Sequence, residues 1–108
     1  MAETYKVLGQ SAPGAAVLVD AYTVPALTSA IVSTIVAANR GAATSIRIAV
    51  RQAGAAIANQ MYIAFDVAIG ANETLTLTLG ITLATTDVVS VYNTLATVSF
   101  NVFGVEKT

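Results

Sequence analysis

The sequence predicts an all-β protein, an antiparallel β-sandwich of seven or eight strands that forms a single domain over residues 1–108. Three observations predict it. Apolar and polar side chains alternate with a period of two over several segments. Val and Thr are frequent, and both favour strands. Turn residues separate the segments about every 8 to 12 positions, which is the spacing of a sandwich or barrel.

The N-terminal segment has two interpretations. Residues 5–8 are suited to an edge strand, but residues 1–10 are alternatively an arm that reaches a neighbouring molecule, and residues 106–108 are the matching tail. The turn residues Ser11-Ala12-Pro13-Gly14 follow. A strand is expected next, over residues 16–24, where apolar side chains alternate with more polar ones.

Residues 30–38 are expected to form a strand that is apolar on both faces. A lone two-layer sandwich buries only one face of each strand, so the other face is expected in a subunit contact. Ile31 and Ile35 are the candidates for that contact. The strand ends at Asn39-Arg40-Gly41, whose Asn and Gly tolerate the backbone of a tight turn.

Two further strands are expected in the middle of the chain. Residues 45–51 alternate strictly between an apolar face and a face with two arginines. Residues 52–59 contain Gly54 and several Ala, which indicates a loop with a helical turn. Residues 60–69 follow, and the alternation predicts that Ile63, Phe65 and Val67 point inward.

The last three predicted strands cover residues 74–79, 88–92 and 98–103. The first and third alternate strictly, and turn residues precede each of the first two. The predicted core collects apolar side chains from these and the preceding strands: Ile46, Ile48, Val50, Phe65, Leu75, Leu77, Leu79 and Phe100.

The composition combines 56% hydrophobic residues with only 10% charged ones. Average domains carry roughly 25% charged residues, and depletion of charge is typical of interface centres. We therefore expect a homo-oligomer, a trimer or a higher ring. The mean hydropathy is +0.73, but polar residues interrupt every long uncharged stretch, so no membrane partner is expected.

Enzymatic chemistry is not expected. The chain has no Cys, which excludes disulfides and a thiolate metal site, and no His, which removes the commonest general base and metal ligand. Asp66 and Glu73 flank a turn, but two carboxylates are too few for a cation site, and Asp87 is expected to bond local backbone. No catalytic residue, metal or cofactor is therefore predicted. A net charge of −1 also argues against nucleic acid.

Five polar or aromatic side chains remain as candidates for a partner contact. Arg40, Arg47 and Arg51 lie within twelve residues and would form either a patch for an acidic partner or a solvated sheet face. No interleaved aromatic residues accompany them, which disfavours nucleic acid. Tyr22 and Tyr92 would either stack on a ligand or place their hydroxyls at the rim of the sandwich.

Several stretches resemble small structural proteins of tailed bacteriophages. The similar segments are residues 22–26, 30–41, 45–50, 72–75, 83–91 and 99–106. The pattern often has Gly after Pro25-Ala26, where this chain has Leu27. The motifs are strand and turn patterns without a chemical signature. The resemblance implies a component of the virion, made in the cytoplasm of the host bacterium.

Three functions are compatible with that resemblance. The first is a capsid decoration or cement protein, whose partners would be its own copies and the major capsid protein. The second is a neck, tail or baseplate component that packs against tail or neck proteins. The third is a receptor- or carbohydrate-binding module, for which exposed aromatic side chains should cluster at one loop end; with four Tyr and three Phe in the chain, it is the weakest of the three.

Overall fold

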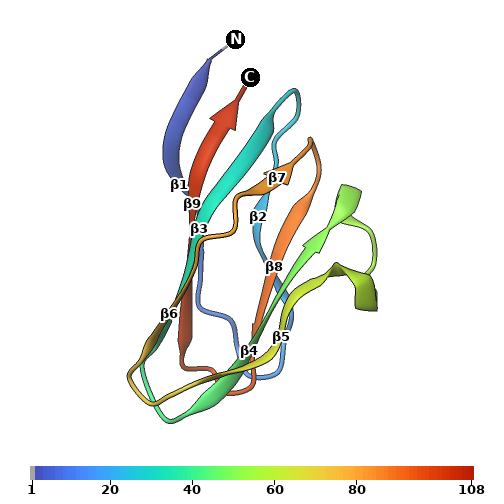
Figure 1. Ribbon diagram of the computed structural model, residues 1–108. Coiled ribbons are helices and arrows are strands. Elements are labelled where there is room, and N and C mark those ends of the chain that lie inside the picture. Colours follow the sequence, from blue (N-terminus) through green and yellow to red (C-terminus); the bar gives the residue numbers. More distant parts are fainter. Residues whose placement is uncertain (1) are drawn as a thin grey trace.

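The computed structural model describes residues 2–108 and has two antiparallel β-sheets packed face to face (Figure 1). Sheet A has the order β1 (Glu3–Ser11), β9 (Val98–Lys107), β3 (Ser29–Asn39) and β6 (Thr74–Leu77), with β7 (Ile81–Leu83) also paired to β3. Sheet B has the order β2 (Val19–Thr23), β8 (Val88–Asn93), β4 (Thr44–Arg51) and β5 (Tyr62–Ile69). The predicted all-β sandwich is confirmed.

Strands β6 and β7 lie end to end along the same edge of β3. The first pairs with residues 35–38 and the second with residues 30–32, so nine strands occupy eight positions. Between them the chain leaves the sheet at residues 78–80, where Gly80 has a φ of 66°. The strand predicted over residues 74–79 therefore ends at Leu77, and Leu79 is 53% exposed rather than in the core.

The loop between β4 and β5 contains two short 3₁₀ turns, η1 (Gln52–Gly54) and η2 (Asn59–Met61). This confirms the helical turn expected there. No helix within residues 2–108 is long and apolar enough to cross a membrane.

The core lies between the two sheets and contains mostly Val, Ile and Ala side chains. Ile46, Ile48 and Phe100 are fully buried, as the alternation predicts. Three other predicted core residues pack against it while partly exposed, namely Val50, Leu75 and Leu77. The prediction is wrong for Phe65, which is 55% exposed.

A bulge in β5 explains the position of Phe65. Ile46 pairs with Val67 but Ile48 pairs with Ala64, so β5 has one more residue than β4 over this interval. The extra residue moves Phe65 to the outside and places Ala64 inside. A second irregularity follows on the other side of Ala64, and Ile63 is 42% exposed.

A bulge in β3 separates Ile31 from Ile35. Val32 pairs with Gly104 while Thr34 pairs with Phe103, so Ser33 is the extra residue. Ile31 is 50% exposed on the outer face of sheet A, whereas Ile35 is 2% exposed and belongs to the core. The prediction that both side chains share a contact face is wrong for Ile35.

The N-terminal segment is an edge strand and not an arm. Residues 3–11 pair with β9, and the backbone N–H of Thr108 donates to the carbonyl of Ala2. Both ends of the chain lie side by side at one end of the molecule (Figure 1). Residues 106 and 107 extend β9, so the predicted tail is also wrong there. Met1, the first residue of the predicted arm, lies outside the described residues.

Two buried asparagines fasten the loops at the other end of the sandwich. The Asn39 amide donates to the carbonyls of Ala42 and Gly70. The Asn93 amide donates to two carbonyls of the β1–β2 loop, and its oxygen accepts the backbone N–H groups of Thr97 and Val98. All four hydrogen-bonding positions of the Asn93 side chain are thus occupied in a fully buried site.

Candidate functional site

The three predicted arginines do not form one patch. Arg40 lies in the β3–β4 turn, where its Nε donates to Ser99 Oγ at 2.8 Å. Arg51 donates to Asp20 at 3.0 Å and to backbone carbonyls of the following loop. Arg47 lies on the same outer face of sheet B as Arg51 but is paired with Asp66. Each guanidinium is thus engaged by its own neighbours.

Tyr22 is buried and cannot stack on a ligand. Its side chain is 7% exposed, and its hydroxyl donates to Glu106 Oε2 at 2.7 Å. Lys6 Nζ donates to the other oxygen of Glu106 at 3.1 Å. Burial and the hydrogen bond to Glu106 raise the pKa of Tyr22, and the hydrogen bonds from Tyr22 and Lys6 lower the pKa of Glu106. This group joins three strands and has a structural role.

Arg47 lies at the centre of an aromatic cluster on the outer face of sheet B. Its guanidinium carbon is 4.2 Å from the Phe65 ring centroid and 4.5 Å from that of Tyr92. Asp66 accepts two hydrogen bonds from it, at 2.6 and 3.3 Å, and these raise the pKa of Arg47. Tyr62 meets Phe65 edge to face, with centroids 4.9 Å apart and an interplanar angle of 79°. We call these five residues the aromatic cluster.

A hollow opens beside the aromatic cluster. Asn59, Tyr62 and Phe65 line it, and its volume is about 480 Å³. Asn59 belongs to the η2 turn and is exposed, so its amide can donate to and accept from a ligand. This hollow combines aromatic rings with a polar group, which is the usual composition of a small-molecule site.

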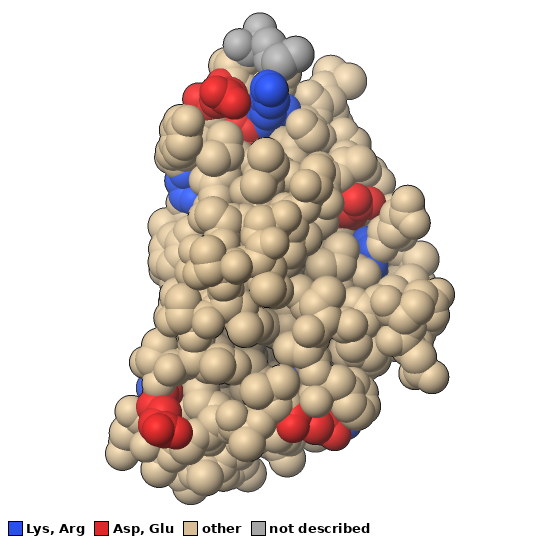
Figure 2. Space-filling view, viewed as in Figure 1, with Lys and Arg blue, Asp and Glu red and all other residues tan. Residues whose placement is uncertain are grey.

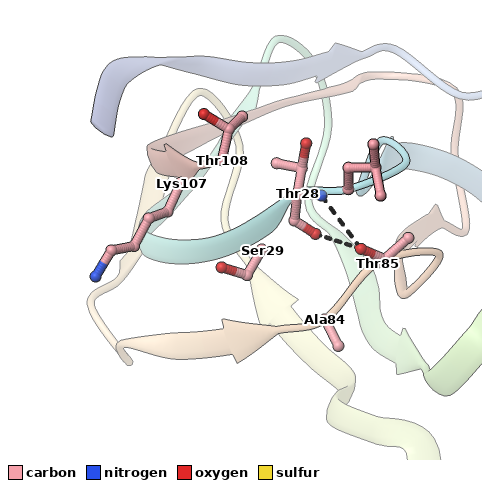
Figure 3. A pocket seen from close by; sticks show the side chains of 7 residues that line it. Thr28, Ser29, Ala84, Thr85, Lys107 and Thr108 are labelled. Atoms are coloured by element: carbon pink, nitrogen blue, oxygen red, sulfur yellow. Dashed lines mark hydrogen bonds between the residues drawn. The ribbon is translucent and has the colours of Figure 1, made fainter. Parts of the chain in front are cut away.

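Two other hollows carry little chemistry. The first, of about 520 Å³, lies between the start of β3 and the loop after β7, where Thr28 and Thr85 bond each other (Figure 3). Its one titratable side chain is Lys107, whose amine points away from the two threonines (Figure 3). The second, of about 300 Å³, is lined by the β1–β2 corner and β9 without any charged residue.

The carboxylates make structural contacts. Asp87 accepts the backbone N–H of Ala84 at 2.9 Å, which confirms the local bond expected for it, and that of Ala53 at 2.8 Å. Asp66 is tied to Arg47. Within residues 2–108 no three carboxylates gather closely enough to hold a metal ion.

The outer face of sheet A carries an apolar patch. Tyr5, Val105 and Ile31 form one row across β1, β9 and β3, and Val7 and Phe103 stand beside each other in the next row. Tyr5 is 78% exposed, and Val7 and Ile31 are about half exposed. We call these five residues the sheet A patch. Its uncharged side chains provide a surface that another protein can cover.

Charged side chains are few and mostly paired. Four ion pairs use eight of the eleven charged residues: Lys6–Glu106, Arg47–Asp66, Arg51–Asp20 and Lys107–Glu3. Figure 2 shows small groups of charges near the margins of the molecule and an uncharged area between them. The surface therefore offers little net charge to a partner.

Sequence reasoning missed Phe65 as a functional candidate. The alternation of residues 60–69 places Phe65 in the core, and no local signal marks the bulge that turns it outward. The pairing of Arg47 with Asp66, nineteen residues away, is also invisible before the strands are paired.

No protein-family model matches the chain, and neither a curated protein nor a solved structure matches it. The candidate sites are therefore interpreted from their own geometry.

Proposed function

We propose that this protein is a non-enzymatic structural subunit of a bacteriophage particle, a capsid decoration protein that stabilises the head by symmetric packing. The observation that carries the proposal is the sheet A patch, five uncharged side chains of which three are exposed and two partly buried. The resemblance of the strand and turn segments to phage structural proteins supports the same conclusion. Depletion of charge is typical of the centre of a protein interface.

We assign the sheet A patch to the contact between copies of this chain. Glu3 and Lys107 lie side by side in the next row of the sheet, so the margin of the patch has one charge of each sign. Such a margin can complement a second copy of itself. Closed symmetry covers the patch in every subunit without open-ended association.

A neck, tail or baseplate component would use the same patch in the same way. The two roles differ in copy number, since a head has many more equivalent positions than a neck or tail. Quantitative mass spectrometry and cryo-electron microscopy of the assembled particle separate them. Hundreds of copies on the head support the decoration role, a few dozen or fewer support the neck or tail, and absence from the particle contradicts both.

The contact between copies is tested in solution by light scattering on the purified protein. We expect a mass that is a small multiple of 11.0 kDa. Ile31→Asp places a charge within the patch and should yield monomers. Leu27→Asp is the control, because Leu27 is 91% exposed and lies outside the patch. A monomeric parent protein, or an Ile31→Asp variant that assembles normally, would contradict this assignment.

A further inference from the structure

We propose that the outer face of sheet B is a binding site for a neutral saccharide, centred on Phe65 and Tyr62. The site is on the sheet opposite to the sheet A patch and is independent of the role proposed above. It consists of the aromatic cluster and the neighbouring hollow lined by Asn59.

The backbone of β5 is arranged to expose an aromatic ring. Asp66 has a φ of 51°, in the left-handed region that non-glycine residues rarely adopt. The bulge that contains it turns Phe65 outward and gives the core position to the much smaller Ala64. Regular alternation would instead place the phenyl ring between the sheets. Bulges frequently re-aim side chains beside functional sites.

The exposed ring is also held in place. The Arg47 guanidinium packs on it at 4.2 Å, Tyr92 lies 4.5 Å from the same guanidinium, and Asp66 fixes the guanidinium with two hydrogen bonds. Tyr62 adds an edge-to-face contact from the same strand. A ring that is already fixed loses little conformational freedom when a ligand stacks on it, which favours binding.

The chemistry of the hollow fits a sugar ring. Its volume of about 480 Å³ lies within the range of small-molecule sites, roughly 300–1,000 Å³. A pyranose has an apolar C–H face that packs on an aromatic ring, and hydroxyls at its margin that both donate and accept hydrogen bonds. Phe65 and Tyr62 provide the rings, and the Asn59 amide provides a donor and an acceptor.

Charge balance indicates that the ligand is neutral. Arg47 already occupies the position that a cation would take on the Phe65 ring. Its ion pair with Asp66 reduces its attraction for an anionic ligand. A proline-rich peptide would also be uncharged, but it docks along several aromatic ridges in a groove. Here only two rings and one amide line the hollow. The saccharide is therefore favoured.

The site is tested by titrating ¹⁵N- and ¹³C-labelled protein with maltohexaose, cellohexaose or chitotetraose while recording NMR spectra. We expect at least one of the three to shift the signals of Asn59, Tyr62 and Phe65 at concentrations up to ~10 mM. Phe65→Ala should weaken that binding by about tenfold or more. Leu79→Ala is the matched control, since it removes a side chain of similar exposure, 53% against 55%, from the segment between β6 and β7, away from the hollow.

The amide backbone spectrum shows whether each variant is folded, and Asn59→Ala tests the same hollow without changing β5. The proposal is overturned if none of the three saccharides shifts these signals, or if Phe65→Ala and Asn59→Ala both bind like the parent protein. It is also overturned if a polyproline peptide shifts the same residues and the saccharides do not.

Discussion

The Tyr22 hydroxyl and the Glu106 carboxylate show how one polar contact joins distant parts of the chain. Tyr22 lies in β2 of one sheet and Glu106 in β9 of the other, with Lys6 of β1 on the second carboxylate oxygen. The hydrogen bonds favour the ionised carboxylate, which is why they lower the pKa of Glu106. Burial of the Tyr22 hydroxyl and its hydrogen bond to the Glu106 carboxylate raise the pKa of Tyr22.

Tyr22→Phe should lower the free energy of unfolding by about 1.5–3 kcal/mol at neutral pH, because it removes a hydrogen bond to a charged group. The pKa of Glu106 should rise toward its ordinary value of 4.5. A carboxylate with a lowered folded pKa contributes stability above the unfolded pKa and loses it as the pH falls through the folded pKa. The difference in the free energy of unfolding between the parent protein and Tyr22→Phe should therefore shrink below about pH 4.5.

The measurement is urea denaturation of both proteins between pH 3 and 7, together with an NMR titration of the Glu106 carboxyl carbon. Equal stabilities at pH 7, or a Glu106 pKa that Tyr22→Phe leaves unchanged, would show that the hydrogen bond contributes nothing.

Glycines allow elements to approach where a side chain would not fit. A Cβ on Gly9 in β1 would lie 2.0 Å from the carbonyl oxygen of Ala21 in β2, so the two sheets meet closely at this edge. Gly104 in β9 has the same relation to the carbonyl oxygen of Ile31 in β3, beside the β3 bulge. Backbone cannot move aside as a side chain does, which makes both positions specific for glycine.

Gly9→Ala should destabilise the protein by at least about 1–3 kcal/mol, since β1 and β2 must separate to admit the methyl group. Gly14→Ala is the control, because nothing lies within 4 Å of the added carbon, and it should change stability by less than about 0.5 kcal/mol. Chemical denaturation of the two variants compares them directly. Equal losses of stability in the two variants would mean that β1 and β2 leave room for a methyl group at Gly9.

Phe100→Ala tests the regular alternation of β9. Phe100 is 1% exposed between the sheets, so its truncation should cost about 3–5 kcal/mol through lost burial and the cavity left behind. Leu79→Ala, outside any strand, should cost less than about 0.5 kcal/mol. Thermal and urea unfolding measure the loss of stability in both variants. If Leu79→Ala destabilises the protein as much as Phe100→Ala, Leu79 belongs to the core.

The whole molecule lacks the residues that usually titrate near neutral pH. It contains neither His nor Cys, whose ordinary pKa values lie closest to 7. Folding should therefore exchange few protons between pH 6 and 8. We expect the free energy of unfolding to vary by less than about 0.5 kcal/mol over this range. Urea denaturation at several pH values tests this. A larger change in the free energy of unfolding would reveal an ionisable group coupled to folding.

The sequence by itself determined the all-β class and the inner faces of β4 and β9. These follow from period-two alternation, because successive side chains of a regular strand point to opposite faces. Only the tertiary structure decided that Phe65 faces outward and that Ile35 faces inward. Each depends on a bulge, and the position of a bulge is set by which strand lies alongside, over sequence separations that local alternation does not encode.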